Sequence, residues 1–126
     1  MLSDITSRKD IELLLTKFYE RAFADDAIGY IFTEVTHLDL NVHLPVIANF
    51  WEDMLLGSHN YNGNPVKIHQ HIDKLTELNE QHFNRWLMLW QVTIDEYFAG
   101  EKATEAKQRA GNIAQIMLVK IAQNRP

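Results

Sequence analysis

The sequence predicts an all-α fold, and three observations support this. Apolar residues recur every three or four positions along almost the whole chain, which is typical of amphipathic helices. The three prolines and five glycines are few, and they fall near the ends of these periodic segments. No alternating run is bounded by turns, so no strand is predicted. The 126 residues suit one domain, residues 1–126, and the 46% hydrophobic fraction can fill its core.

The first predicted helix begins near Ser7, whose hydroxyl can cap free amides while Asp10 follows three residues later. Its pattern fades at Asp25 and Asp26. The short apolar stretch at residues 28–32 predicts a turn that plugs the core. The buried stripe of this helix consists of Ile11, Leu14, Leu15, Phe18 and Ala22.

A second long helix is predicted from about residue 41 to residue 56, and Gly57 ends it. Pro45 lies early enough to be tolerated, because first-turn amides have no helical partner. Residues 57–65 form a turn-rich loop, and Pro65 suits the first turn of a short helix that carries His69. The stripe of the long helix consists of His43, Ile47, Phe50, Trp51, Met54 and Leu55.

Two more helices complete the prediction. The first begins near Asn79, which can cap it, and is stopped by Gly100, while the second runs from about Thr104. The inward face of the first consists of Phe83, Trp86, Leu87, Trp90, Ile94 and Tyr97. The inward face of the second consists of Ala106, Ala110, Ile113, Met117 and Ile121.

The composition argues against several functional classes. Without cysteine the chain has no disulfide, thiolate nucleophile or thiolate metal site. A net charge of −5 without a basic run argues against a nucleic-acid partner. No signal peptide or membrane span is visible, so a cytoplasmic protein is expected. There is no phosphate-binding glycine loop, no HExxH zinc motif and no GxSxG motif.

Three polar side chains lie on faces that should pack inward, namely Tyr19, His43 and Trp86. Buried polar groups need partners, so the three together predict a shared polar pocket in an apolar cavity. Taken singly, each also fits ordinary packing with its polar tip at the surface. His69 alone also fits a surface position, and His71, two residues away, does not share its helix face.

Several separate motifs along the chain resemble those of the group III truncated haemoglobins. They are residues 49–57 (NFWEDMLLG), residues 61–65 (YNGNP) followed by His69, residues 82–86 (HFNRW), the pair Phe18-Tyr19, and Phe32. The absence of Gly-Gly favours this group, since the other truncated groups carry paired glycines. The sequence departs from the pattern at residues 73–77, where many members have a shorter turn with proline.

The resemblance implies a shortened globin fold, two helices packed over two, around haem b. His69 would be the proximal iron ligand, and Tyr19, His43 and Trp86 would donate hydrogen bonds on the distal side. Either Lys67 or Arg85 would pair with a haem propionate, unless both are simply exposed to solvent. The apolar walls would come from Phe32, Ile47, Phe50, Trp51, Ile68, Phe83 and Trp90.

The function that this resemblance implies is reversible binding of oxygen, and of nitric oxide or carbon monoxide, at a five-coordinate iron. An alternative is an enzyme, a nitric-oxide dioxygenase or a peroxidase-like protein, that uses the same haem with a separate reductase. A second alternative is a haem-free helical interaction module. The sequence does not distinguish a carrier from an enzyme, because the same hydrogen-bond donors serve both.

Overall fold

The computed structural model describes all 126 residues, and every regular element in it is helical. Short connections join the elements, apart from the loop between Leu56 and Pro65. In chain order they are α1 (Arg8–Ala24), the π-helix η1 (Ile31–Val35), α2 (Leu40–Leu56), α3 (Pro65–Leu75), α4 (Glu80–Tyr97) and α5 (Glu101–Asn124).

In four of the five α-helices, the residue directly before the helix caps it with a polar side chain that accepts hydrogen bonds from free backbone amides. Ser7 accepts from the amide of Asp10 at the start of α1, as predicted. Asn79 caps α4, and the ring of His82 accepts the amide of Asn79 in return. Asp39 caps α2 and Asn64 caps α3, where Pro65 takes the first position.

Four details of the predicted helices are wrong. The helix α5 begins at Glu101 rather than near Thr104, and Gly100 precedes α5 instead of stopping α4, which ends at Tyr97. Residues 31–35 form a π-helix and not only a turn. Pro45 is the sixth residue of α2, beyond the first turn, so the helix lacks the bond that an amide at this position would make.

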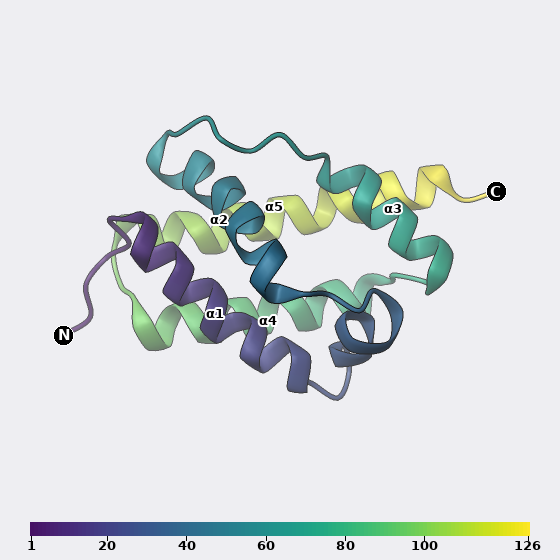
Figure 1. The fold of residues 1–126 in the computed structure, drawn as a ribbon, viewed down its shortest axis with the longest axis horizontal. Helices are drawn as coiled ribbons and strands as arrows, with labels where there is room; N and C mark the ends of the chain where they lie inside the picture. Colours follow the sequence, from purple (N-terminus) through teal and green to yellow (C-terminus); the bar gives the residue numbers. More distant parts are fainter.

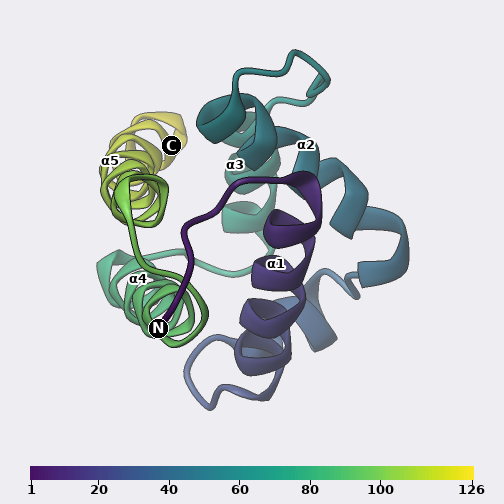
Figure 2. The same ribbon diagram turned by 90° about the vertical axis from the view of Figure 1, so that its left-hand side faces the viewer.

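The helices form two layers, with α1 and α2 in one layer and α4 and α5 in the other (Figures 1 and 2). The long helices contact each other within each layer, and α1 also packs across on α4. The short helix α3 lies beside the last turns of α5. This is the predicted arrangement of two helices over two.

The core is a cluster of 23 buried apolar residues, to which α1, α2, α4 and α5 all contribute. In contrast, no residue of α3 is fully buried. The helix therefore stands off from the core, and an internal space remains beside it. None of the helices is both long and apolar enough to cross a membrane.

Candidate functional site

A cavity of about 760 Å³ lies where α2, α3 and α4 face one another. Its walls also include Tyr19 of α1 and Met117 of α5, and 20 of its 27 lining residues are hydrophobic. Ligand pockets in proteins typically occupy about 300–1,000 Å³ and combine apolar walls with a few polar groups. In size and in lining, this cavity has the character of a site for a large, mostly apolar ligand.

The structure brings most of the sequence-predicted site residues to this cavity. They come from α1, η1, α2, α3 and α4, which are far apart in the sequence. Those that line the cavity are Tyr19, Phe32, His43, Ile47, Phe50, Trp51, Lys67, Ile68, His69, Phe83 and Trp86.

Two predicted residues, Trp90 and Arg85, do not line the cavity. Trp90 is 1% exposed and lies behind the wall, where its ring stacks on Trp86 and on Trp51 at centroid distances of 6.2 and 4.7 Å. It therefore supports two wall residues. Arg85 donates two hydrogen bonds, of 2.9 and 2.6 Å, to the Asp25 carboxylate, which holds it away from the cavity.

His69 lines the cavity, and one of its ring nitrogens is engaged within its own helix while the other has no partner in the protein. The Nδ1 atom lies 2.7 Å from the carbonyl oxygen of Pro65. A carbonyl oxygen only accepts, so Nδ1 carries the hydrogen and Nε2 of the neutral ring keeps a free lone pair. Burial lowers the pKa of His69, although the hydrogen bond to Pro65 raises it in part. The site thus contains a neutral, oriented imidazole.

The predicted polar trio of Tyr19, His43 and Trp86 comes together at the cavity, and none of the three makes a side-chain hydrogen bond within the protein. The ring of Tyr19 is fixed by edge contacts with Phe18 and Phe32 at 5.0 and 5.8 Å. Burial raises the pKa of its hydroxyl, which therefore remains a protonated donor. His43 differs from the other two because it is exposed, at the edge of the cavity.

Four polar residues that were not predicted from the sequence also line the cavity: Thr36, Tyr61, His71 and His82. The spacing of Lys67 and His71, four residues apart, could have revealed His71, since such residues share a helix face. The His82 ring accepts the amide of Asn79 and lies 3.2 Å from the Tyr30 hydroxyl. Tyr61 packs edge-on against Phe50 at 5.2 Å, a contact between loop and helix that no sequence pattern predicts.

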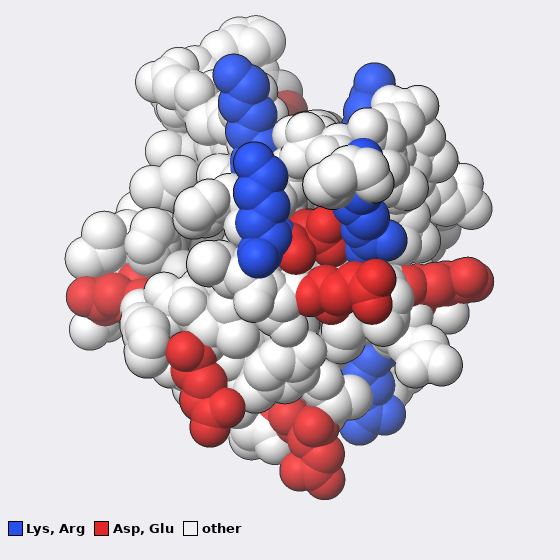
Figure 3. Space-filling view, turned by 90° about the vertical axis from the view of Figure 1, so that its right-hand side faces the viewer, with Lys and Arg blue, Asp and Glu red and all other residues white.

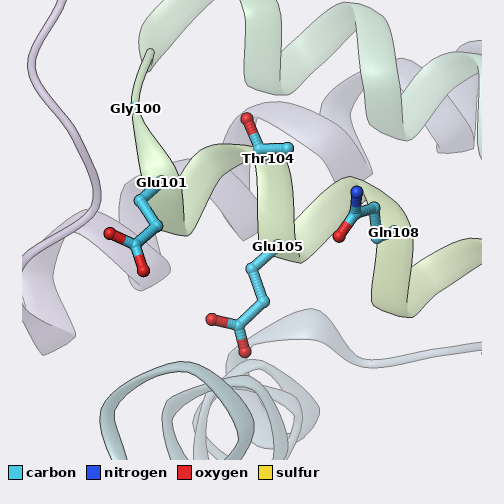
Figure 4. A pocket seen from close by; sticks show the side chains of 5 residues that line it. All are labelled: Gly100, Glu101, Thr104, Glu105 and Gln108. Carbon is cyan, nitrogen blue, oxygen red and sulfur yellow. The ribbon is translucent and has the colours of Figure 1, made fainter.

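A second hollow, of about 410 Å³, lies at the start of α5 and contains no apolar lining (Figure 4). Two of its carboxylates, Glu101 and Glu105, point to the same side of the helix. Glu105 is already paired with Lys102 and Arg109. No group of three or more His, Asp or Glu side chains is placed to hold a metal ion anywhere in the structure. The apolar cavity is therefore the better candidate.

Comparisons of the sequence and of the structure with known proteins each find a relative, although no family model matches the sequence. The chain is 32% identical over 117 residues to the group 3 truncated hemoglobin ctb of Campylobacter jejuni, and the match covers 90% of each chain. The chain belongs to the group III truncated haemoglobins. The crystal structure of the group III truncated hemoglobin from Campylobacter jejuni matches with a TM-score of 0.83 and 30% identity, over 96% of this chain and 95% of that one.

As a group III truncated haemoglobin, the protein is a haem-based, gas-binding globin. The prediction of a shortened globin fold is confirmed by this relationship and by the two-layer arrangement of helices. Residues 73–77, where the sequence departs from the family pattern, span the end of α3 and the start of the link that follows it. The helix α3 continues to Leu75, and residues 76–79 connect it to α4.

Proposed function

We propose that the protein binds haem b in the 760 Å³ cavity and uses it to bind oxygen, and other diatomic gases, reversibly. The observation that carries this proposal is the position of His69 on the cavity wall, with its Nδ1 hydrogen bonded to Pro65. When bound, haem would supply an iron centre with one open coordination position for a gas ligand. The apolar lining suits the porphyrin, and the neutral imidazole suits iron.

In this proposal His69 holds the iron through Nε2. A histidine ligand usually donates its other ring hydrogen to a carbonyl or carboxylate, which fixes the tautomer and the ring orientation. The 2.7 Å contact between Nδ1 and the carbonyl of Pro65 would do this. Because burial lowers the pKa of His69, its ring is neutral at pH 7 and ready to coordinate.

Tyr19 and Trp86 would donate hydrogen bonds to the gas ligand. Each has a donor without a protein partner on a cavity whose walls are otherwise mainly apolar. His43 would act at the edge of the cavity, where its exposed ring can donate or accept according to its tautomer. Hydrogen bonds to charged groups contribute about 1.5–3 kcal/mol, so these donors would slow ligand release.

The apolar walls would exclude water from the site, which strengthens the hydrogen bonds inside it. The buried ring of Trp90 would hold Trp86 and Trp51 in place by stacking on both. At the exposed rim, the Lys67 ammonium makes no ion pair within the protein and lines the cavity, so it could pair with a propionate. Arg85 is less suited to this role because it is paired with Asp25.

The first test is the visible absorption spectrum of the purified protein in its oxidised, reduced and carbonmonoxy forms. We expect an intense Soret band that shifts on reduction and shifts again when carbon monoxide is added. A protein that shows no Soret band, even after haem is supplied, would contradict the proposal. The haem-free interaction module would then be the better interpretation of the fold.

A further inference from the structure

The helix that carries His69, α3, differs from the other α-helices in how little of it is buried in the core. Each of the other α-helices places at least three fully buried residues in the core, and α3 places none. Most of the stability of a helix in a protein comes from packing of its apolar face. Only partly buried side chains of α3, such as Val66 and Ile72, pack against the core, so polar contacts add to a limited apolar packing.

The most extensive of these contacts joins the last turn of α3 to Arg125, which directly follows α5. The Arg125 guanidinium donates from Nε and Nη2 to the two carboxylate oxygens of Asp73, at 3.0 and 2.8 Å. The Asp73 side chain is only 8% exposed. Ion pairs with two parallel hydrogen bonds fix the relative orientation of the two side chains and also stabilise the fold. The electrostatic attraction is less weakened by solvent when the carboxylate is sheltered.

The same two side chains also hold the link that follows α3. Nη2 of Arg125 donates to the carbonyl of Leu78 at 2.9 Å, and the Asp73 carboxylate accepts the amide of Leu78 at 2.8 Å. Leu78 is itself buried in the core, with 5% exposure. The ion pair thus joins the end of α3, the end of α5 and a core residue before α4.

The register of α3 connects this pair to the cavity. Asp73 lies four residues after His69, about one helical turn away on the same side of the helix. One residue after His69, the side-chain amide Nε2 of Gln70 donates to the backbone carbonyl of Lys120 in α5 at 3.1 Å. On the face that carries α3 and the end of α5, basic and acidic side chains lie close together near the centre (Figure 3).

We infer that the Asp73–Arg125 pair is a clamp that fixes α3 against α5 and thereby positions His69 on the cavity wall. The inference rests on the proposed function, in which His69 holds the haem iron. Arg125 is a positioning residue, since it does not line the cavity. Asp73 lies in the last turn of α3 and is the first residue of the stretch, residues 73–77, where the sequence departs from the family pattern.

The test compares Arg125→Gln with the unaltered protein and with Asp4→Ala as a matched control. Asp4 accepts amides of Lys102 and Ala103 at the other end of α5, so its loss weakens the fold without touching α3. Three quantities are measured: hydrogen–deuterium exchange of α3 amides in haem-free protein, the rate of haem loss to an acceptor globin, and the iron–histidine stretching band of the reduced protein.

With Arg125→Gln we expect faster exchange across residues 65–75, haem loss about five- to tenfold faster, and a shifted or broadened iron–histidine band. Arg125→Lys keeps the charge but not the two-pronged contact, and should restore these properties in part. This variant also provides the test if Arg125→Gln does not fold. Asp4→Ala should leave all three measurements close to those of the unaltered protein.

Two different results would overturn the inference. If the unaltered protein binds haem and the Arg125 variants match it in all three measurements, the clamp has no positioning role and the proposed function stands. If the unaltered protein binds no haem, the proposed function fails and the role assigned to Arg125 fails with it.

Discussion

Tyr19 and Trp86 place hydrogen-bond donors on an apolar cavity without giving them protein partners. Both donors are open to the cavity, since no fully buried side-chain nitrogen or oxygen in the protein lacks a hydrogen-bond partner. Trp90, in contrast, is enclosed in the core and donates to the carbonyl of Ala106 at 3.2 Å. In the proposed site, the Trp86 donor is therefore free for a ligand, whereas the Trp90 donor is used inside the protein.

Replacing Tyr19 by Phe should speed oxygen release by roughly tenfold or more, because it removes one donor worth about 1.5–3 kcal/mol. The edge contacts of the ring with Phe18 and Phe32 would remain. Stopped-flow measurement of the oxygen dissociation rate gives the result. Tyr97→Phe is the control, since Tyr97 does not line the cavity. An equal rate in all three proteins would remove Tyr19 from the site.

Replacing His69 by Ala should abolish or greatly weaken haem binding, because no other imidazole on the cavity combines one nitrogen fixed by a hydrogen bond with a second nitrogen that has no protein partner. His71→Ala provides the comparison, since His71 also lines the cavity but is exposed. Haem content per chain and the Soret band are the measurements. Equal haem content in the two variants would show that His69 is not the iron ligand.

At the scale of the helices, the ends are set by caps, and one cap comes from far away in the sequence. Asp4 accepts the amides of Lys102 and Ala103 at 2.9 Å each, and so begins α5 at Glu101. Burial raises the pKa of Asp4, but the hydrogen bonds from these amides and from Ile5 outweigh it, and the net shift is downward. The carboxylate form is therefore the one that caps α5.

Replacing Asp4 by Ala should lower the free energy of unfolding by about 1–2 kcal/mol, as expected for the loss of a helix cap. Urea unfolding followed by circular dichroism measures the change. Asp10→Ala offers a local comparison, because Asp10 accepts only from Thr6 on the surface of α1. If Asp4→Ala lowered the free energy of unfolding no more than Asp10→Ala does, the Asp4 cap would add no more stability than a surface contact.

For the molecule as a whole, several carboxylates bind protons less readily in the folded state than their ordinary pKa values predict. Hydrogen bonds from Arg85 and Arg125 lower the pKa of Asp25 and of Asp73, respectively. A depressed pKa stabilises the fold above the unfolded pKa of about 3.9, and this contribution is lost as the pH falls through the folded value.

We therefore expect the free energy of unfolding of the haem-free protein to fall steeply as the pH drops below about 4. Urea unfolding at pH 7, 5 and 3 measures it. The variant Asp25→Asn should be less stable than the unaltered protein at pH 7, and this difference should shrink at pH 3. A constant difference over that range would show that ionisation of Asp25 does not stabilise the fold.

The sequence by itself determined the helices, their inward faces and eleven of the 27 residues that line the cavity. Apolar periodicity and capping residues act over a few positions, so Ser7, Asn64 and Asn79 mark helix starts without any knowledge of the fold. The motifs around His69 and Trp86 could also be recognised from the sequence alone, because their resemblance to the family depends only on residue identity and spacing.

Only the tertiary structure decided which residues on one helix face meet the cavity. Trp86 and Trp90 are equivalent by periodicity, yet stacking of α4 on its neighbours places Trp90 behind Trp86. Many carboxylates in the sequence are possible partners for Arg85. The fold pairs it with Asp25, which is sixty residues away. The depth at which a side chain is buried, and its ion-pair partner, depend on contacts between segments that are distant in the sequence. The formation of a helix, in contrast, depends on residues within one or two turns along the chain.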